Sequence, residues 1–240
     1  DGISSMKNPF RINYPCKCIE MKPYETAFGD GKTEHNIVMK TKPLDELKTR
    51  AHQHFVDSIA TKQLGAQSLP LEVARAILLI TRSIEADGKI MACGNGGSAA
   101  DAQHFAAELM GRFERERREL AALALTTDSS ILTAIGNDYS YEEVFSKQVR
   151  GIGRSGDVLI AISTSGNSKN VIKAIEAAKK IGIHIVAMTG NGGGKIAALL
   201  SGEDVHLCVP ATRTARIQET HLLLLHCLCD GVDHVLFGED

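Results

Sequence analysis

Five short apolar runs, spaced along the second two thirds of the chain, predict the strands of a sheet. They lie at residues 90–93, 120–125, 158–162, 183–188 and 205–209. Each run is apolar throughout and does not alternate with polar residues, which is typical of parallel strands that are buried on both faces. Because the stretches between the runs mostly have a helical pattern, we expect a three-layer α/β/α sandwich with a five-stranded parallel sheet.

Two helices precede the first strand in this prediction. From residue 44 to about 67, apolar or small side chains recur at three- and four-residue steps, as they do in an amphipathic helix. Pro70 opens a second helix, which ends at Asp87-Gly88 because glycine suits the left-handed closing turn of a helix. The sheet is therefore expected to begin only at residue 90.

The last segment, from residue 213 to about 236, predicts a long helix with a continuous apolar stretch at 222–225. That stretch is too apolar for one side of the helix to lie in water. Two interpretations remain open, a core helix and an interface with another copy of the chain, since a surplus apolar face needs a partner.

The beginning of the chain differs from the rest. The first 42 residues contain three of the six prolines, two cysteines and no sustained periodicity. We interpret residues 1–43 as an N-terminal extension, either natural or left by the expression vector, and residues 44–240 as a single domain.

The composition excludes several classes of protein. A net charge of -2 leaves no excess of basic residues for nucleic acid or an anionic membrane, and 43% hydrophobic residues can bury a core. No apolar run reaches the roughly 18 to 20 residues that cross a bilayer. We expect a cytoplasmic protein that binds neither nucleic acid nor membrane.

The cysteines are expected to be reduced. Cys93 and Cys208 lie in predicted strands, and Cys227 and Cys229 lie in the last helix, where a thiol packs as a small apolar group. Another Cys-x-Cys pair begins at Cys16. Both pairs have a single intervening residue, whereas structural zinc sites usually have about two to four. Neither pair is interpreted as a metal site.

A glycine-rich segment, GNGGSA at residues 94–99, follows the first apolar run and precedes a helix that carries His104 and Glu108. Four residues of helix turn the chain by about 400°, so both side chains lie on one face and can reach one ion or one substrate. By itself, such a pair is more often a surface pair on an amphipathic helix. The glycine loop before it favours a ligand site, because junctions of this kind bind ligands in α/β sheets.

A second loop, STSGNS at residues 163–168, also lies between a strand and a helix and carries four hydroxyl groups. The free N–H groups and the dipole of a helix start attract anions, and hydroxyl groups can complete a phosphate cradle. Capping of the helix by Ser168 would account for only one of the four hydroxyls. Neither loop fits the Walker or the dinucleotide pattern, so we expect a small phosphorylated molecule between them.

Four ordered motifs carry a resemblance to a known family. They are GNGGSAADAQHFAAEL, GND at residues 136–138, DVLIAISTSGNS, and RIQETHLLLLH at residues 216–226. They closely resemble those of the phosphoheptose (sedoheptulose 7-phosphate) isomerases, which have the sugar-isomerase (SIS) fold. The resemblance covers residues 44 to about 237, and it implies a homotetramer with one zinc ion per subunit.

The resemblance also implies the roles of individual residues. Those implied to contact the sugar are Asn95, Gly96, Gly97, Ser98, Asn137, Asp138 and Gln218. Those implied to hold the phosphate are Ser163, Thr164, Ser165 and Ser168. Those implied to bind zinc are His104, Glu108, Gln218 and His226. Imidazole and carboxylate groups are ordinary zinc ligands, whereas an amide oxygen is a weaker one.

In the reaction that the resemblance implies, a proton leaves carbon 1 of the ketose and one is added at carbon 2 through an enediol. Glu108 would be the base and His226 the complementary acid, since both side chains can be tuned towards a neutral pKa in a pocket. Zinc would polarise the carbonyl group. The product, D-glycero-D-manno-heptose 7-phosphate, would feed the synthesis of ADP-heptose and lipopolysaccharide core.

Three positions bear on this assignment. Gln218 and His226 stand eight residues apart, about 12 Å along a helix, so they must converge on the site or come from neighbouring subunits. Ala215 stands where many members of the family have an aspartate, a departure that bears on substrate orientation. His221 lies about 500° around the helix from His226 and is expected to be structural. The other histidines expected to be structural or exposed are His52, His54, His184, His206 and His234.

Two other interpretations stay open. The segments AISTSGNS, TARIQE and HCLCDGVDHVLF also resemble the noncatalytic SIS protein that binds the bacterial replication initiator DnaA. That relative typically lacks the glutamate and the final histidine, whereas this chain has Glu108 and His226. A sugar-phosphate-sensing regulator is the third interpretation, although residues 1–43 have neither the basic charge nor the helix-turn-helix pattern of a DNA-binding segment.

Overall fold

The structure is a computed structural model, and it describes residues 43–238. The predicted extension, residues 1–43, lies outside this range except for Pro43, and so does the pair at Cys16. The helical segments are α1 (Leu44–Ser68), α2 (Pro70–Glu85), α3 (Gly97–Met110), α4 (Ser129–Asp138), η1 (Tyr141–Glu143), α5 (Val144–Ile152), α6 (Lys169–Lys180), η2 (Asn191–Gly193), α7 (Gly194–Ala197) and α8 (Thr214–Phe237). The strands are β1 (Ile90–Cys93), β2 (Ala122–Ala124), β3 (Val158–Ser163), β4 (His184–Thr189) and β5 (Val205–Cys208).

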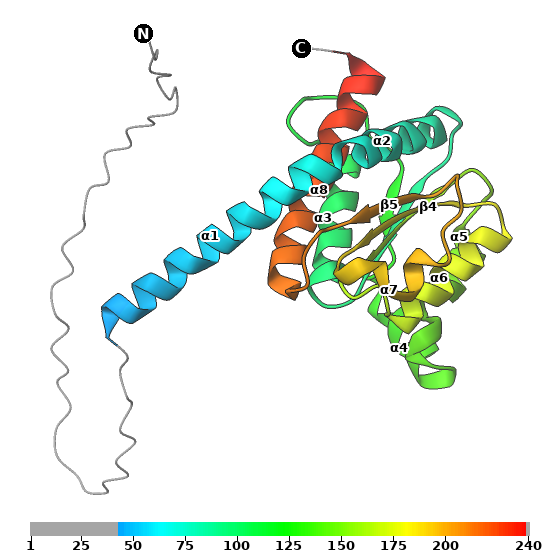
Figure 1. Cartoon of the computed structure of the whole chain (residues 1–240). Coiled ribbons are helices and arrows are strands. Elements are labelled where there is room, and N and C mark those ends of the chain that lie inside the picture. The colour runs from blue at the N-terminus through cyan, green and yellow to red at the C-terminus, as the bar shows by residue number, and fades with distance from the viewer. Residues whose placement is uncertain (1–42, 239–240) are drawn as a thin grey trace, which may run out of the picture. The chain divides into compact units, whose positions relative to one another are not determined.

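The five strands form one parallel sheet in the order β2-β1-β3-β4-β5 (Figure 1). β1 lies between β2 and β3, and Ile90 is in register with Ala122 on one side and with Val158 on the other. The direction of the strand order therefore changes at β1. In sheets of this order, ligands bind beyond the carboxyl ends of the strands where the direction changes. The two predicted loops begin there, one after β1 and one after β3.

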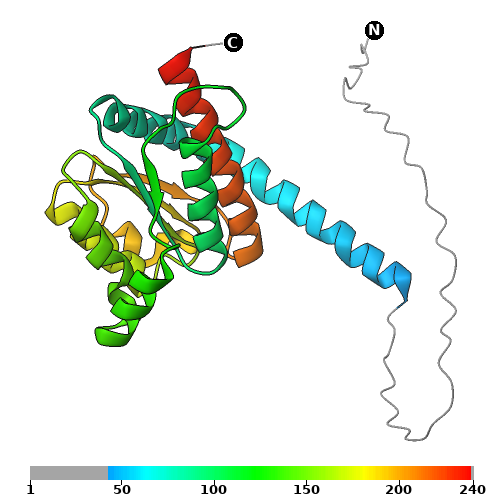
Figure 2. The ribbon, with the colours of Figure 1, turned by 180° about the vertical axis from the view of Figure 1, so that it is seen from behind.

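Alternate residues of the strands pack against helices on opposite faces, which confirms the predicted three-layer sandwich. Ile160 and Ile162 of β3 belong to the core that α2, α3 and α8 cover, whereas Leu159 and Ala161 belong to the core that α5 and α6 cover. Figures 1 and 2 show the sheet between these two helical layers. Burial on both faces explains why β3 is apolar over most of its length.

Most predicted bounds agree with the structure within one or two residues, and β2 is the exception. The apolar run 120–125 predicts a longer strand, but only Ala122–Ala124 pairs with β1. Leu120 and Leu125 are buried beyond the ends of the strand, and Leu123 is 41% exposed. The prediction of burial on both faces is wrong for β2, because the described chain leaves the face of the sheet that carries Leu123 partly uncovered.

α1 is the helix least covered by the rest of the described chain. Its predicted apolar positions Leu47, Phe55 and Ile59 are all exposed, Phe55 by 71%. Figures 1 and 2 show the beginning of the helix extending away from the sheet, and the contacts of α1 are with α8 and α2. An amphipathic helix whose apolar side stays exposed is typical of a surface that another protein chain covers.

The last helix, α8, is a core helix for most of its length. Leu224 and Leu225 are buried in the core of the sandwich, which confirms the first of the two interpretations. Leu223 is exposed and lines an apolar groove of about 350 Å³ between α1, α2 and α8. The second interpretation, an interface with another copy, remains a prediction for this groove.

The cysteines within residues 43–238 are all free thiols. Cys93 and Cys229 are buried, and Cys208 and Cys227 are half-buried. Burial raises the pKa of the Cys93 thiol to about 12, so this group stays protonated and packs as an apolar side chain. The expectation of reduced, packed cysteines is confirmed for this part of the chain.

No single helix among the described residues is long and apolar enough to span a membrane. α1 and α2 meet that criterion only when they are taken together, as a pair bent by 69°.

Candidate active site

The loop after β1 is joined to the helix after β3 by reciprocal side-chain hydrogen bonds. The amide of Asn95 donates to Oδ1 of Asn170, and the amide of Asn170 donates to Oδ1 of Asn95, both at 2.8 Å. Asn170 lies in the first turn of α6, and the Tyr141 hydroxyl of η1 also donates to Oδ1 of Asn95, at 3.3 Å. Asn95, predicted to contact the sugar, is therefore fixed between the two predicted loops.

The other predicted sugar residues of this loop lie at the start of α3. Gly96 and Gly97 are exposed, and Ser98 is buried. A side chain at Gly97 would overlap the terminal amide of Gln218 on α8, so the glycine leaves room for that amide at the start of α3. Gln218, a predicted sugar and zinc residue, therefore lies at the same end of α3 as the loop.

The loop after β3 has the arrangement expected of a phosphate cradle. Ser168 is the N-cap residue of α6, but its side chain makes no capping hydrogen bond. Instead, the hydroxyls of Ser163 and Ser168 lie 3.0 Å apart, the former from the buried end of β3. Simple capping by Ser168 therefore does not account for the hydroxyls of this loop, and the start of α6 can receive an anion.

A third loop, η2 and its neighbours, supports the phosphate loop from behind. Gly166 has a φ of 65°, and a side chain there would overlap the backbone of Gly193. The backbone N–H of Gly190 donates to the carbonyl of Thr164 at 3.1 Å, and that of Lys195 donates to Oδ1 of Asn167 at 3.1 Å. These contacts fix the path of the loop that carries the hydroxyl groups.

Two histidines that were expected to be structural fix the end of β4. His221 is fully buried, and its Nε2 lies 3.0 Å from the carbonyl of Thr189. Burial lowers the pKa of His221 to about 4, so the ring is neutral at pH 7 and donates through Nε2. His206 lies 2.7 Å from the Thr189 hydroxyl. His221 faces the sheet, as the helical spacing predicts.

Asn137 and Asp138 lie at the end of α4 and are exposed. The amide of Asn137 donates to Oδ1 of Asp138 at 2.9 Å. The chain continues directly into η1, whose Tyr141 contacts Asn95. Their predicted contact with the sugar stays a prediction.

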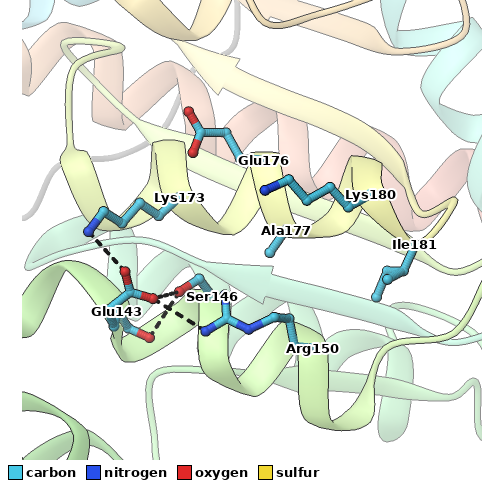
Figure 3. A pocket seen from close by; sticks show the side chains of 8 residues that line it. All are labelled: Glu143, Ser146, Arg150, Lys173, Glu176, Ala177, Lys180 and Ile181. Carbon is cyan, nitrogen blue, oxygen red and sulfur yellow. Dashed lines mark hydrogen bonds and ion pairs between the residues drawn. The ribbon is translucent and has the colours of Figure 1, made fainter. Parts of the chain in front are cut away.

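A charged network fixes η1 to α6. Glu143 accepts hydrogen bonds from Ser146 at 2.6 Å, Lys173 at 2.9 Å and Arg150 at 3.3 Å (Figure 3). These residues line a cavity of about 230 Å³ between α5 and α6. Because Lys173 and Arg150 of this cavity already pair with Glu143, they are not free to bind a phosphate group, and we keep the candidate site at the two loops. The hydrogen bonds to Ser146 and Lys173 lower the pKa of Glu143 to about 2.

The predicted catalytic residues gather where α3 lies beside α8. Nε2 of His104 lies 2.9 Å from Oε1 of Glu108, and the His104 and His226 rings meet edge to face with centroids 5.2 Å apart. Phe113 flanks His226 on the other side, at 5.5 Å between centroids. The side chains of His104 and Glu108 are 39% and 24% exposed, so a ligand can reach them.

Gln218 does not join this cluster within one chain. It lies against Gly97, whereas His226 lies against His104, seven residues further along α3. Seven residues of helix correspond to about 10 Å, so α3 and α8 run side by side with two separate groups between them. Of the two arrangements left open for Gln218 and His226, the separation of the two side chains within one chain favours neighbouring subunits, and that arrangement stays a prediction.

Three of the four predicted zinc ligands fit the metal by their chemistry. His104 and His226 supply two imidazoles and Glu108 supplies a carboxylate, a donor set that is common in zinc sites. Glu108 and His226 each lie next to His104. No group of three or more His, Cys, Asp or Glu side chains in residues 43–238 is already arranged around a common point for a metal. The hydrogen bond between His104 and Glu108 occupies atoms that a zinc ion would use, so the side chains must turn to bind it.

The sequence did not reveal several residues that shape the site. Asn170 and Tyr141 fix Asn95, and Thr189 connects the buried His221 and the half-buried His206 to the third loop. They are single polar residues outside any motif, and only their place in the fold gives them a role. For Asn170, its position two residues after the phosphate loop was the available signal.

Comparisons with known proteins agree with this geometry. A family model described as SIS domain matches residues 54–190. The phosphoheptose isomerase of Dechloromonas aromatica (strain RCB) is 62% identical over 193 residues, which are 80% of this chain and 98% of that protein. The phosphoheptose isomerase of Neisseria meningitidis serogroup A / serotype 4A is 60% identical over 190 residues, which are 79% of this chain and 96% of that protein.

Two solved structures have the same fold. Phosphoheptose isomerase GmhA from Neisseria gonorrhoeae superposes with a TM-score of 0.75 at 57% sequence identity, over 78% of this chain and 98% of that one. A phosphoheptose isomerase from Francisella tularensis superposes with a TM-score of 0.76 at 39% identity, over 81% and 100% of the two chains.

The close packing of the phosphate loop gives a first prediction. We expect Gly166→Ala to weaken the binding of inorganic phosphate about 10-fold, because strain of about 1–2 kcal/mol at a left-handed position, added to overlap with Gly193, displaces the loop. Isothermal titration calorimetry measures the affinity. Gly202→Ala is the control, since a side chain there meets nothing within 4 Å. Equal affinities of the Gly166 variant and the wild type would contradict the cradle.

The Glu143 network gives a prediction about pH. Its pKa falls from an ordinary 4.5 to about 2, so its stabilising contribution is complete above pH 4.5 and is lost as the pH falls towards 2. We expect the melting temperature of Glu143→Gln to be lower than that of the wild type at pH 7, and the difference to vanish near pH 2. Glu176→Gln, in the same cavity, is the control. A difference that persists unchanged at pH 2 would refute the network's ionic character.

Proposed function

The chain belongs to the SIS-domain family of phosphoheptose isomerases, and on this premise we propose that it converts sedoheptulose 7-phosphate to D-glycero-D-manno-heptose 7-phosphate. The observation that carries the proposal is the loop at residues 163–168, whose hydroxyls lie at the uncapped start of α6 beside Asn95. The product would supply the synthesis of ADP-heptose and lipopolysaccharide core.

The phosphate end of the substrate is assigned to the loop after β3. Its hydroxyls come from Ser163, Thr164, Ser165 and Ser168, and the backbone N–H groups at the start of α6 add donors without a cation. The sugar then extends towards the loop after β1. The residues proposed to contact it are Asn95, Gly96, Gly97, Ser98, Asn137, Asp138 and Gln218.

The proton transfers are assigned to the cluster between α3 and α8. Glu108 removes a proton from carbon 1 of the ketose and returns it to carbon 2. His226 donates a proton to the oxygen on carbon 2 and accepts one from the oxygen on carbon 1, which leaves the aldose. The proximity of both residues to His104 supports this assignment, since an acid and a base must reach adjacent carbon atoms.

We further assign a zinc ion to His104, Glu108 and His226, with the Gln218 amide as a weaker ligand. When bound, zinc polarises the substrate carbonyl and stabilises the charge that develops on its oxygen. Glu108 and His226 keep their roles in proton transfer in this assignment.

The site is proposed to be completed between copies of the chain. Gln218 and the phosphate loop lie at one end of α3, and the catalytic cluster lies about 10 Å further along it. A neighbouring copy can bring its own cluster to the open loops, as a homotetramer would allow. The exposed apolar side of α1 and the groove beside Leu223 offer the surface that such an assembly requires.

A cytoplasmic location belongs to the same proposal, because a phosphorylated sugar is charged and stays in the compartment where it is made. The alternative of an adaptor for DnaA receives no support from the relatives described above, which carry the name phosphoheptose isomerase. Ala215, which replaces the aspartate of many family members, is exposed one turn before Gln218 and so lies at the sugar end of the site.

The role of Glu108 is tested by Glu108→Gln. We expect turnover of sedoheptulose 7-phosphate in the presence of zinc to fall by about 10² to 10⁴, because the amide cannot accept the proton. The melting temperature should stay close to that of the wild type, since glutamine has the same shape. Glu116→Gln, an exposed residue of the next segment, is the control. Equal activity of Glu108→Gln and wild type would remove Glu108 from its role.

The shared site is tested by mixing two inactive variants. Glu108→Gln and Gln218→Ala are unfolded together and refolded, so that copies assemble at random. If each site takes Gln218 from one copy and Glu108 from another, mixing restores about a quarter of the wild-type activity. Separately refolded variants are the control. If the mixture stays as inactive as its components, each chain supplies its whole site.

A further inference from the structure

Arg117, in the segment between α3 and β2, binds the end of α3 with nearly all of its donors. Its side chain is 1% exposed. Nη2 donates to the carbonyl of Glu108 at 2.7 Å, and Nη1 donates to the carbonyls of Leu109 at 2.9 Å, Gly111 at 3.0 Å and Arg118 at 3.1 Å. The last carbonyls of a helix have no partner within it, and the dipole there favours a cation. Arg117 therefore caps α3 at the turn that carries Glu108.

The same guanidinium also binds α8. Nε of Arg117 donates to Oδ1 of Asp233 at 2.8 Å, and the Asp233 side chain is 5% exposed. Asp233 follows His226 by seven residues, about 700° of helix, so both side chains lie on the stripe of α8 that faces α3. α3 and α8 are thus joined at two successive levels, by His104 with His226 and by Arg117 with Asp233.

We propose that Arg117 and Asp233 are positioning residues of the isomerase, which hold the turn of Glu108 at a fixed height beside His226. The inference rests on the catalytic roles proposed for those two residues. Arg117 touches the backbone of Glu108 directly, and Asp233 is on the same helix as His226. A shift of α3 along α8 would therefore change the distance between base and acid, and it would break these hydrogen bonds.

The chemistry of the pair suits positioning better than stability. A buried ion pair contributes little more to stability than apolar residues of the same volume, because both charges lose their hydration. The planar fork of arginine, in contrast, fixes several acceptors in one geometry, which an apolar contact or a lysine does not do. The pair therefore sets the register of two helices.

The experiment compares Arg117→Lys and Asp233→Asn with wild type in steady-state kinetics on sedoheptulose 7-phosphate. We expect kcat to fall about 10- to 100-fold in both variants, as when groups that orient a site are removed. KM should change less than about 3-fold, because Arg117 and Asp233 make no contact with the loops in the described part of the chain. Arg117→Lys keeps a cation beside Asp233, so it tests the fork alone.

Asp157→Asn is the matched control. Asp157 is equally buried and pairs with Lys89 at 2.6 Å, but it lies at the amino end of β3, away from the site. We expect it to lower the melting temperature while kcat stays within about 2-fold of wild type. The double variant Arg117→Met with Asp233→Leu leaves no charge unpaired, so it should lose less thermal stability than Arg117→Met alone, yet keep the low kcat.

The outcomes separate the two proposals. If Glu108→Gln is inactive but Arg117→Lys and the double variant have the kcat of the wild type, the positioning role is overturned and the catalytic assignment stands. If Glu108→Gln retains full activity, the catalytic assignment itself fails. A kcat that follows the melting temperature across all variants, Asp157→Asn included, would reduce Arg117 and Asp233 to a structural role.

Discussion

The parallel register of β1 and β3 is the constraint on which the site depends. Because Ile90 pairs with Val158, β1 ends opposite Ala161, two residues before the end of β3, and the loops that follow the two strands leave the same edge of the sheet as neighbours. The reciprocal bonds between Asn95 and Asn170 then join these loops across the gap. A parallel sheet needs helices on both faces, so the core that buries β3 also fixes the helix starts that receive an anion.

The second constraint is the side-by-side course of α3 and α8. Each helix begins at the carboxyl edge of the sheet and carries one group near its start and another one to two turns further along. Gly97 lets Gln218 approach the start of α3, and His226 meets His104 further along. One pair of helices therefore carries a residue proposed to bind the sugar at one end, Gln218, and residues proposed to take part in the reaction further along, His104 and His226. The distance between these two groups is the physical reason for proposing that two copies of the chain contribute to one site.

The sequence predicted the sandwich because strands that are buried on both faces consist of apolar residues. A strand covered on both faces has no polar positions, and residues 158–162 show this clearly, whereas the edge strand β2 shares the apolar pattern without sharing the burial. The motifs predicted the positions of the two loops after β1 and β3, and the roles of the residues in them stay predictions. The roles of Arg117 and Asn170 were not predicted, because important partners of these residues lie far away in the sequence. The separation of Gln218 from His226 depends on which helix each one faces, which spacing along α8 alone does not define.

The missing cap of α6 has a consequence for how the protein meets its ligand. Ser168 accepts a hydrogen bond from the Ser163 hydroxyl and makes no capping bond to the helix, although the N–H of Val171 in the first turn is bonded to Oδ1 of Asn170. An anion bound at the start of α6 would accept hydrogen bonds from its first N–H groups, as an N-cap side chain does. In the proposed binding mode, the substrate phosphate would complete the first turn of α6 while it stays bound, and release of the product would leave that turn open again.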